Sequence, residues 1–176
     1  MASETELSEV LSDFARTMVT DFSIQSILDR LVERIVEIMP VSAAGVTLIA
    51  PGVEPRYIAA SDADALQFEK LQTELGEGPC LAAYHTGEAV SVPDLGCEGR
   101  FPTFVARAMD VGLGAVFTFP LRLDGRRIGA LDLYRGTPGD LSAGSMKAAQ
   151  TLADVTTAYL VNAEARADQG ELLPVP

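Results

Sequence analysis

The chain has 176 residues, which is enough for one domain with additional helices, and 48% of its residues are hydrophobic while 22% are charged. This composition is that of a globular protein and excludes intrinsic disorder. The formal net charge of −12 would repel phosphate groups, so we expect neither a nucleic-acid surface nor binding to anionic membranes.

The sequence also points to a cellular location. No run approaches the ~18 continuous apolar residues of a membrane span. The first ten residues, MASETELSEV, lack the basic and apolar regions of a secretory signal. We therefore expect a cytoplasmic protein in which Cys80 and Cys97 are reduced thiols.

Two amphipathic helices are predicted first. Apolar residues recur with the i, i+3, i+4, i+7 spacing of a helix from Leu7 to Met18 and again from Ile24 to Met39. Ser23 is the expected N-cap of the second helix, and Pro40 ends it. Two β-like runs then follow in residues 41–61, with a turn at Pro51-Gly52.

The remaining elements alternate between short helices and strands. A helix is expected over 63–75, a brief strand over 89–92, and a helix over 101–111. A hairpin follows, with arms 115–123 and 127–134 around the turn signal Asp124-Gly125. Both arms are apolar at nearly every position, which predicts burial on both faces. A long helix covers about 142–167.

These elements predict an α+β fold with a central antiparallel sheet. The N- and C-terminal helices pack on one face, and the loops and short helices between residues 63 and 111 cover the other face and enclose a pocket. The expected division is an N-terminal helix over 1–22, a domain over 23–167 and a flexible tail over 168–176.

Four segments together carry a family resemblance: ILDRLVERIVEIMPVSAAGVTLI, LGEGPCLAAYHTGEAVSVPDL, FPLRLDGRRIGALDLYR and LSAGSMKAAQTLADVTTAYL. In this order and spacing they resemble the GAF domain family, a family of small-molecule sensor domains related to PAS domains. The resemblance covers about residues 5–165. The GPC form and the hairpin look most similar to actinobacterial GAF domains that precede an RNA-binding ANTAR output domain.

The resemblance implies a regulatory, non-enzymatic domain in signal transduction and transcription regulation. It implies an unidentified small organic ligand, no other cofactor, a homodimer formed through the terminal helices, and a separate output domain or partner protein. The ligand pocket would then be lined by Phe68, Cys80, Tyr84, Asp94, Phe101, Phe104, Phe117, Phe119 and Asp132. A structural role for Asp132, in an ion pair with Arg122 on the partner arm, is the alternative.

The stretch GEGPCLAAYHTG, residues 76–87, concentrates the candidate chemistry. Gly76 and Gly78 form a GxG, but Leu81 replaces the third glycine of a dinucleotide fingerprint. We expect instead a tight turn with positive φ at the glycines before Pro79 starts a helix. His85 and two cysteines 17 residues apart lack the paired spacing of a zinc site, so no metal site is predicted.

Two alternatives to the sensor remain. Free methionine-(R)-sulfoxide reductases, a GAF-like branch, carry a similar Gly-x-Gly-x-Cys loop, which GEGPC matches through Cys80. Their chemistry needs a second cysteine, and Cys97 could serve only if its loop folds over the pocket. The other alternative is an interaction and dimerisation module whose core is filled and which binds no ligand.

Overall fold

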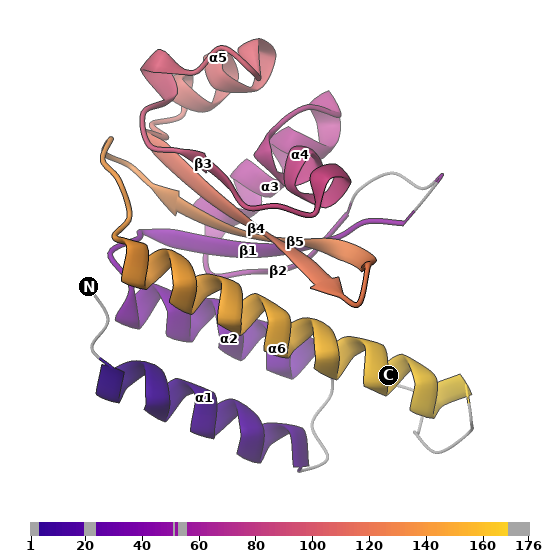
Figure 1. Ribbon diagram of the computed structural model, residues 1–176. Helices are drawn as coiled ribbons and strands as arrows, with labels where there is room; N and C mark the ends of the chain where they lie inside the picture. Colours follow the sequence, from indigo (N-terminus) through magenta and orange to yellow (C-terminus); the bar gives the residue numbers. More distant parts are fainter. Residues whose placement is uncertain (1–3, 20–23, 51, 53–55, 169–176) are drawn as a thin grey trace.

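The computed structural model describes residues 4–19, 24–50, 52 and 56–168, and is built around one antiparallel sheet (Figure 1). The strand order is β2-β1-β5-β4-β3, which places β5 at the centre. Every neighbouring pair is antiparallel. The strands are β1 (Ala43–Leu48), β2 (Arg56–Ala60), β3 (Val90–Val92), β4 (Ala115–Leu123) and β5 (Arg126–Arg135).

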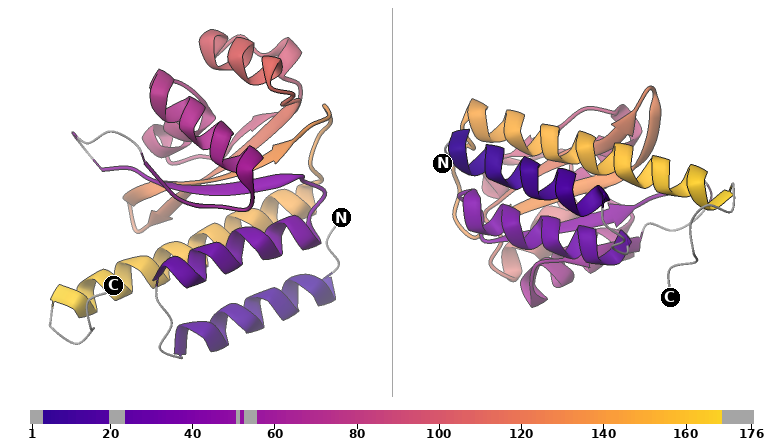
Figure 2. Two further views of the ribbon diagram at one scale, coloured as in Figure 1. Left: turned by 180° about the vertical axis from the view of Figure 1, so that it is seen from behind. Right: turned by 90° about the horizontal axis from the view of Figure 1, so that it is seen from below.

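Helices cover both faces of the sheet. The face that packs against α2 and α6, here called the helix face, is separated by the sheet from α3, α4 and α5, which lie over the opposite site face (Figure 1). α1 lies along α2 and α6 as an outer layer (Figure 2). The helices are α1 (Glu4–Val19), α2 (Ile24–Ile38), α3 (Ala63–Leu75), α4 (Pro79–Thr86), α5 (Pro102–Asp110) and α6 (Ala143–Asp168), with a 3₁₀ turn η1 (Leu95–Cys97) before α5.

This arrangement confirms the predicted α+β fold and its two differently covered faces. The helix expected over 63–75 and the strand expected over 115–123 have the predicted limits. The expected N-cap Ser23, the turn residue Pro51 and the tail residues 169–176 lie outside the described residues. In the described part, no helix is long and apolar enough to cross a membrane.

The buried part of the helix face is apolar. Alternate residues of the three central strands point to it, because successive side chains of a strand project to opposite faces. They pack against the apolar stripes of α2 and α6 in one buried core. The residues that β1, β4 and β5 contribute to this core are Ala44, Val46, Ala115, Phe117, Phe119, Leu121, Leu131 and Leu133.

The β4–β5 hairpin sets the register at the centre of the sheet. Asp124 and Gly125 have φ values of 48° and 81°, as the two central residues of a type I′ turn require. Leu123 pairs with Arg126 next to the turn, but a register shift between Leu121 and Arg122 changes the later pairing. Asp132 therefore lies opposite Thr118.

Candidate functional site

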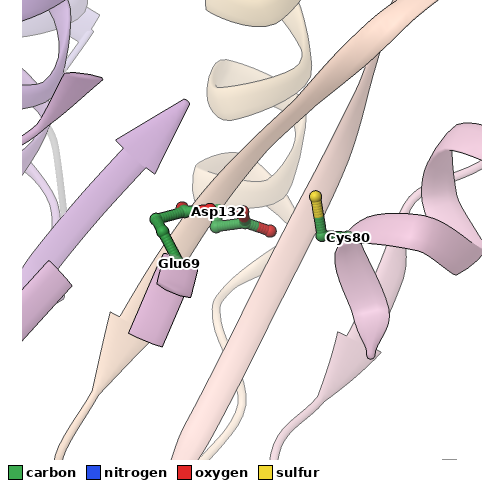
Figure 3. A group of neighbouring side chains, drawn as sticks. All are labelled: Glu69, Cys80 and Asp132. Atoms are coloured by element: carbon green, nitrogen blue, oxygen red, sulfur yellow. The ribbon is translucent and has the colours of Figure 1, made fainter. Parts of the chain in front are cut away.

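Three ionisable side chains meet on the site face of the sheet, between the strands and the helices α3 and α4, and together they are called the acid–thiol cluster. Glu69 comes from α3, Cys80 from α4 and Asp132 from β5 (Figure 3). They are only 1%, 2% and 0% exposed. One potential ligand atom from each, a carboxylate oxygen or the Cys80 sulfur, lies within 4.8 Å of the other two. Such groups are rarely buried together without a specific role.

The neighbours of Asp132 in the sheet make room for this cluster. On one side, Thr118 of β4 donates a hydrogen bond of 2.8 Å from its hydroxyl to Oδ1 of Asp132. On the other side, Gly45 of β1 lies directly opposite Asp132. A Cβ atom at position 45 would overlap the carboxyl group of Glu69. Glycine at this position therefore lets α3 lower its acidic side chain onto the sheet.

Hydrogen bonds from two strands hold the Glu69 side chain. The Thr47 hydroxyl on β1 donates to Oε2. The Tyr134 hydroxyl on β5 donates to Oε1 over 3.0 Å. Gln72, one turn after Glu69 on α3, donates from Nε2 to the Tyr134 oxygen, also over 3.0 Å. The Glu69 carboxyl is thus fixed directly by β1 and β5, while Gln72 holds the Tyr134 hydroxyl in place.

The segment around GEGPC positions the thiol. Gly76 and Gly78 have φ values of 60° and 145°, and α4 begins at Pro79, which confirms the predicted turn and helix start. The backbone N–H of Cys80, which has no partner within its helix, donates to Oε1 of Gln72 over 2.9 Å. A Cβ atom at position 78 would lie 2.5 Å from this oxygen, so glycine is needed for the close approach.

Burial dominates the electrostatics of the cluster. It raises the pKa of Asp132 above its ordinary value. Burial, followed by the negative charge of Asp132, raises the pKa values of Glu69 and Cys80 well above theirs. Oδ2 of Asp132 has no hydrogen-bond partner of ordinary geometry among the described residues, although Glu69 and Cys80 lie close enough to interact with this carboxylate. Oδ2 of Asp132 is therefore a buried acceptor that is available to a ligand.

Six of the nine predicted pocket residues lie on the site face around this cluster. Cys80 and Asp132 belong to it directly. The Phe68 ring packs against Tyr134 with a centroid distance of 4.9 Å. Tyr84 packs partly buried against the small apolar group that includes Cys80. Phe101 and Phe104 are buried further along the same face.

The other three predicted pocket residues lie elsewhere. Phe117 and Phe119 point to the helix face, where they belong to the core with α2 and α6. Strand alternation explains their separation, since Thr118 between them faces Asp132. Asp94 caps η1, accepting from the Gly96 N–H over 2.9 Å.

The alternative ion pair between Asp132 and Arg122 is wrong. Arg122 donates to the backbone oxygen of Gly87 and pairs with Glu88 at 3.7 Å. The pairing partner of Asp132 on β4 is Thr118, four residues before Arg122. At ~3.4 Å per residue this separation is roughly 14 Å along the strand, too far for an ion pair.

Sequence reasoning missed most of the polar side chains around the cluster. Glu69 and Gln72 lie three residues apart in α3, next to the buried Phe68 and Leu71. Two polar residues inside the buried stripe of a helix are the signal that could have found them. Tyr134 follows Asp132 at the i+2 spacing of one strand face, whereas Thr47 and Thr118 carry no comparable sequence signal.

Two surface grooves lie away from the cluster. One, of about 370 Å³, lies between α3 and α5, and its lining includes Lys70, Glu74 and Arg107. The other, of about 450 Å³, lies beside the β4–β5 turn, and its lining includes Arg122 and Arg127. Both arginines donate to backbone oxygens at the end of α4, so they serve as structural links there.

Comparison with solved structures identifies the fold. The GAF domain of a phosphoenolpyruvate-protein phosphotransferase from Coxiella burnetii is similar with a TM-score of 0.76 and 17% identity, covering 94% of this chain and 99% of that one. A free methionine-R-sulfoxide reductase from Neisseria meningitidis gives 0.71 and 16%, covering 94% and 95%. A domain of a putative two-component sensor histidine kinase from Sinorhizobium meliloti gives 0.72 and 16%, covering 86% and 99%.

Sequence comparison is more specific about the family. No curated protein sequence matches the chain significantly. The profile of the GAF domain, however, matches residues 23–160, which include every strand, α2 to α5 and most of α6. This match and the shared architecture agree with the resemblance found in the four sequence segments. The chain belongs to the GAF domain family.

Proposed function

We propose that this GAF domain is a regulatory domain whose input is the binding of a small ligand at the acid–thiol cluster. The observation that carries the proposal is Oδ2 of Asp132, a buried acceptor in the central strand without a hydrogen-bond partner among the described residues. Burying a carboxylate costs free energy unless a donor or cation compensates it. A ligand that supplies the missing partner would bind here.

Because Asp132 lies in β5, this strand could carry the effect of ligand binding from the cluster to the helices on the other face. Asp132 and Tyr134 face the cluster, while Leu131 and Leu133 of the same strand pack in the core with α2 and α6. A close-packed core transmits small displacements, so a shift of β5 would change the packing of these helices. We propose that α1, α2 and α6 carry the output and form a homodimer.

The space between the three cluster residues limits the size of the ligand. The resemblance implies a small organic molecule, but one ligand atom from each of the three cluster residues lies within 4.8 Å of the other two. An organic ligand would therefore need α4 to move away from the sheet.

The finer resemblance, to actinobacterial GAF domains before ANTAR domains, predicts an output in transcription regulation in the cytoplasm.

The thiol-enzyme alternative finds little support at Cys80. Reactive cysteines have lowered pKa values and partly exposed sulfurs. Cys80 is instead buried with a raised thiol pKa, while Cys97 is exposed and donates to Oδ2 of Asp94 over 3.4 Å. We therefore propose that the domain is not an enzyme. Turnover of methionine sulfoxide that is lost in Cys80→Ser would contradict this.

Hydrogen–deuterium exchange tests the proposed regulation. Freshly purified protein is compared with the same protein refolded from denaturant in the presence of EDTA, which removes a bound ligand. We expect faster exchange in β5, α2 and α6 after refolding, because an empty cluster loosens the central strand. In Asp132→Asn, fresh and refolded samples should exchange alike, whereas Asp94→Asn should behave like the wild type.

The opposite pattern would contradict the proposal. Identical exchange of fresh and refolded wild-type protein throughout α2 and α6 would leave the domain as an interaction module without a ligand. Sedimentation of the same samples reports the oligomeric state. A monomer in both would remove the proposed dimer interface.

A further inference from the structure

We propose that Glu69, Cys80 and Asp132 together bind one divalent transition-metal ion of the zinc or iron(II) type. The ion would be held by one oxygen from each carboxylate and by the cysteine sulfur. This inference rests on the proposed function, since it names the ligand class of the same site. It departs from the absence of a metal site expected from histidine and cysteine spacing, because two of the three ligands are carboxylates far apart in the sequence.

The spacing of the three groups fits a single ion. Metal–sulfur bonds of ~2.3 Å and metal–oxygen bonds of ~2.0–2.2 Å place tetrahedral ligand atoms roughly 3.3–3.7 Å apart. In the structure, the three potential ligand atoms already lie within 4.8 Å of one another. Side-chain movements of about 1 Å would therefore complete the coordination. A metal ion is also a ligand that the site can accept without moving α4.

The donor set restricts the identity of the ion. A thiolate favours zinc-like or softer ions, whereas carboxylates alone favour magnesium, calcium and manganese. One sulfur and two oxygens together suit a borderline ion such as Zn²⁺ or Fe²⁺. Binding would exchange water molecules of the ion for one metal–sulfur and two metal–oxygen bonds, and would release to solvent the thiol proton of Cys80 and any proton bound to the two carboxyls. Three protein ligands leave a position free for water or a second small ligand.

The surrounding hydrogen bonds resemble those that orient metal ligands. Thr118 donates to Oδ1 of Asp132 and leaves Oδ2 without a partner, while Thr47 and Tyr134 hold the two oxygens of Glu69. Such outer contacts fix the direction of a ligand and are part of a functional site. Figure 3 shows Asp132 lying between the other two side chains. The unpartnered Oδ2 is the second observation, beyond the clustering itself, that points to a cation.

Cobalt(II) provides a direct test because its bond to a thiolate gives a charge-transfer band in the near ultraviolet. Protein refolded in EDTA, then freed of EDTA and kept reduced, is titrated with Co²⁺ alone. We expect the band to saturate at one ion per chain and to disappear when Zn²⁺ is added. Cys97→Ser should keep the band and Cys80→Ser should lose it. Asp132→Asn should bind Co²⁺ at least about tenfold more weakly.

Several results would overturn the metal site. These are a wild-type protein without the band, a band that persists in Cys80→Ser, or one that is lost in Cys97→Ser. X-ray absorption at the cobalt edge of the wild-type protein gives a readout that does not depend on a variant folding. One sulfur neighbour is expected, and oxygen neighbours alone would contradict the site. If Co²⁺ does not bind although refolding alters exchange in α2 and α6, the metal is wrong while the proposed regulation stands.

Discussion

The two faces of the central sheet are built from the same strands and both pack apolar cores against helices, but the site face also buries a cluster of ionisable side chains. On the helix face, the core residues of β1, β4 and β5 are apolar and pack against α2 and α6. The site face buries two carboxyls, a thiol, a phenol and an amide beneath α3 and α4. Apolar burial stabilises the fold, whereas buried ionisable groups cost free energy unless they are compensated. Apolar packing therefore stabilises both faces, whereas the cost of the buried ionisable groups falls on the site face.

The site face also lacks the features of an accidental polar core. Gly45 is placed where a side chain would overlap Glu69, and Gly78 where one would overlap Gln72. Gly45 lies in β1 and Gly78 is the N-cap of α4, yet both make space for polar side chains of α3. Proteins retain such destabilising arrangements where binding requires them. Substitutions on the two faces should therefore have different signatures.

The largest effect is expected on the helix face, from Leu133→Ala. Leu133 is fully buried, and removing a buried leucine side chain costs about 2–5 kcal/mol of unfolding free energy. Denaturant unfolding measures this loss. Co²⁺ affinity of the folded variant should stay close to that of the wild type. A variant that retains wild-type stability would show that the core of this face contributes little to the free energy of unfolding.

On the site face, Gly45→Ala should destabilise the protein by about 1–3 kcal/mol, because the new methyl group overlaps the Glu69 carboxyl. The same unfolding experiment applies. Gly99→Ala is the matched control, since a Cβ there meets nothing within 4 Å, and its effect should stay within about 0.5 kcal/mol. Equal effects of the two changes would remove the argument that Gly45 makes room for Glu69.

Asp132→Asn, a substitution in the acid–thiol cluster, should raise the free energy of unfolding of the metal-free protein. The amide removes a buried carboxylate and supplies donors, so the metal-free protein should gain about 1–2 kcal/mol. Denaturant titration in EDTA tests this, with Asp94→Asn as the control on an acid outside the cluster. A loss of stability comparable to that of Leu133→Ala would mean that the Asp132 carboxylate serves the fold.

The smallest effect concerns the two thiols. Cys97 should be alkylated in the folded protein and Cys80 only after unfolding, because Cys97 is exposed and Cys80 is buried. The hydrogen bond to Asp94, and then its charge, raise the pKa of Cys97. A raised pKa lowers the thiolate fraction at neutral pH, so Asp94→Asn should speed the alkylation of Cys97. Mass spectrometry of timed reactions measures both, and rapid labelling of Cys80 would contradict its burial.

Much of the fold could be predicted because its signals are local. Amphipathic spacing located α2, the glycines before Pro79 located the start of α4, and Asp124-Gly125 located the hairpin turn. Nearly continuous apolar strands also indicated correctly that both faces of the sheet are covered. Each of these rests on residues that are neighbours in the chain.

The site could be predicted only in part because it depends on register. A regular hairpin in which Leu123 pairs with Arg126 would place Phe117 opposite Asp132. The register shift at Leu121/Arg122 places Thr118 there instead. A one-residue shift changes every cross-strand partner beyond it, and no local sequence signal marks this one.

The partners of Asp132 on the helices are also invisible to local patterns. Glu69 lies 63 positions before Asp132, and Cys80 lies 52 positions before it. Only the packing of α3 and α4 on the sheet brings the three together. The single histidine, His85, is of a residue type typical of functional sites, yet it lies exposed at the end of α4. Chemistry carried by common residues such as glutamate and aspartate is recognised only once they are seen side by side.

Native mass spectrometry of freshly purified protein tests the central claim, that the site face holds a ligand, most directly. The wild-type chain should carry one additional non-covalent mass, that of a single transition-metal ion, and Asp132→Asn should carry none. An organic mass in its place would refute the metal and keep the ligand site. A wild-type chain without additional mass, identical to Asp132→Asn, would contradict the account.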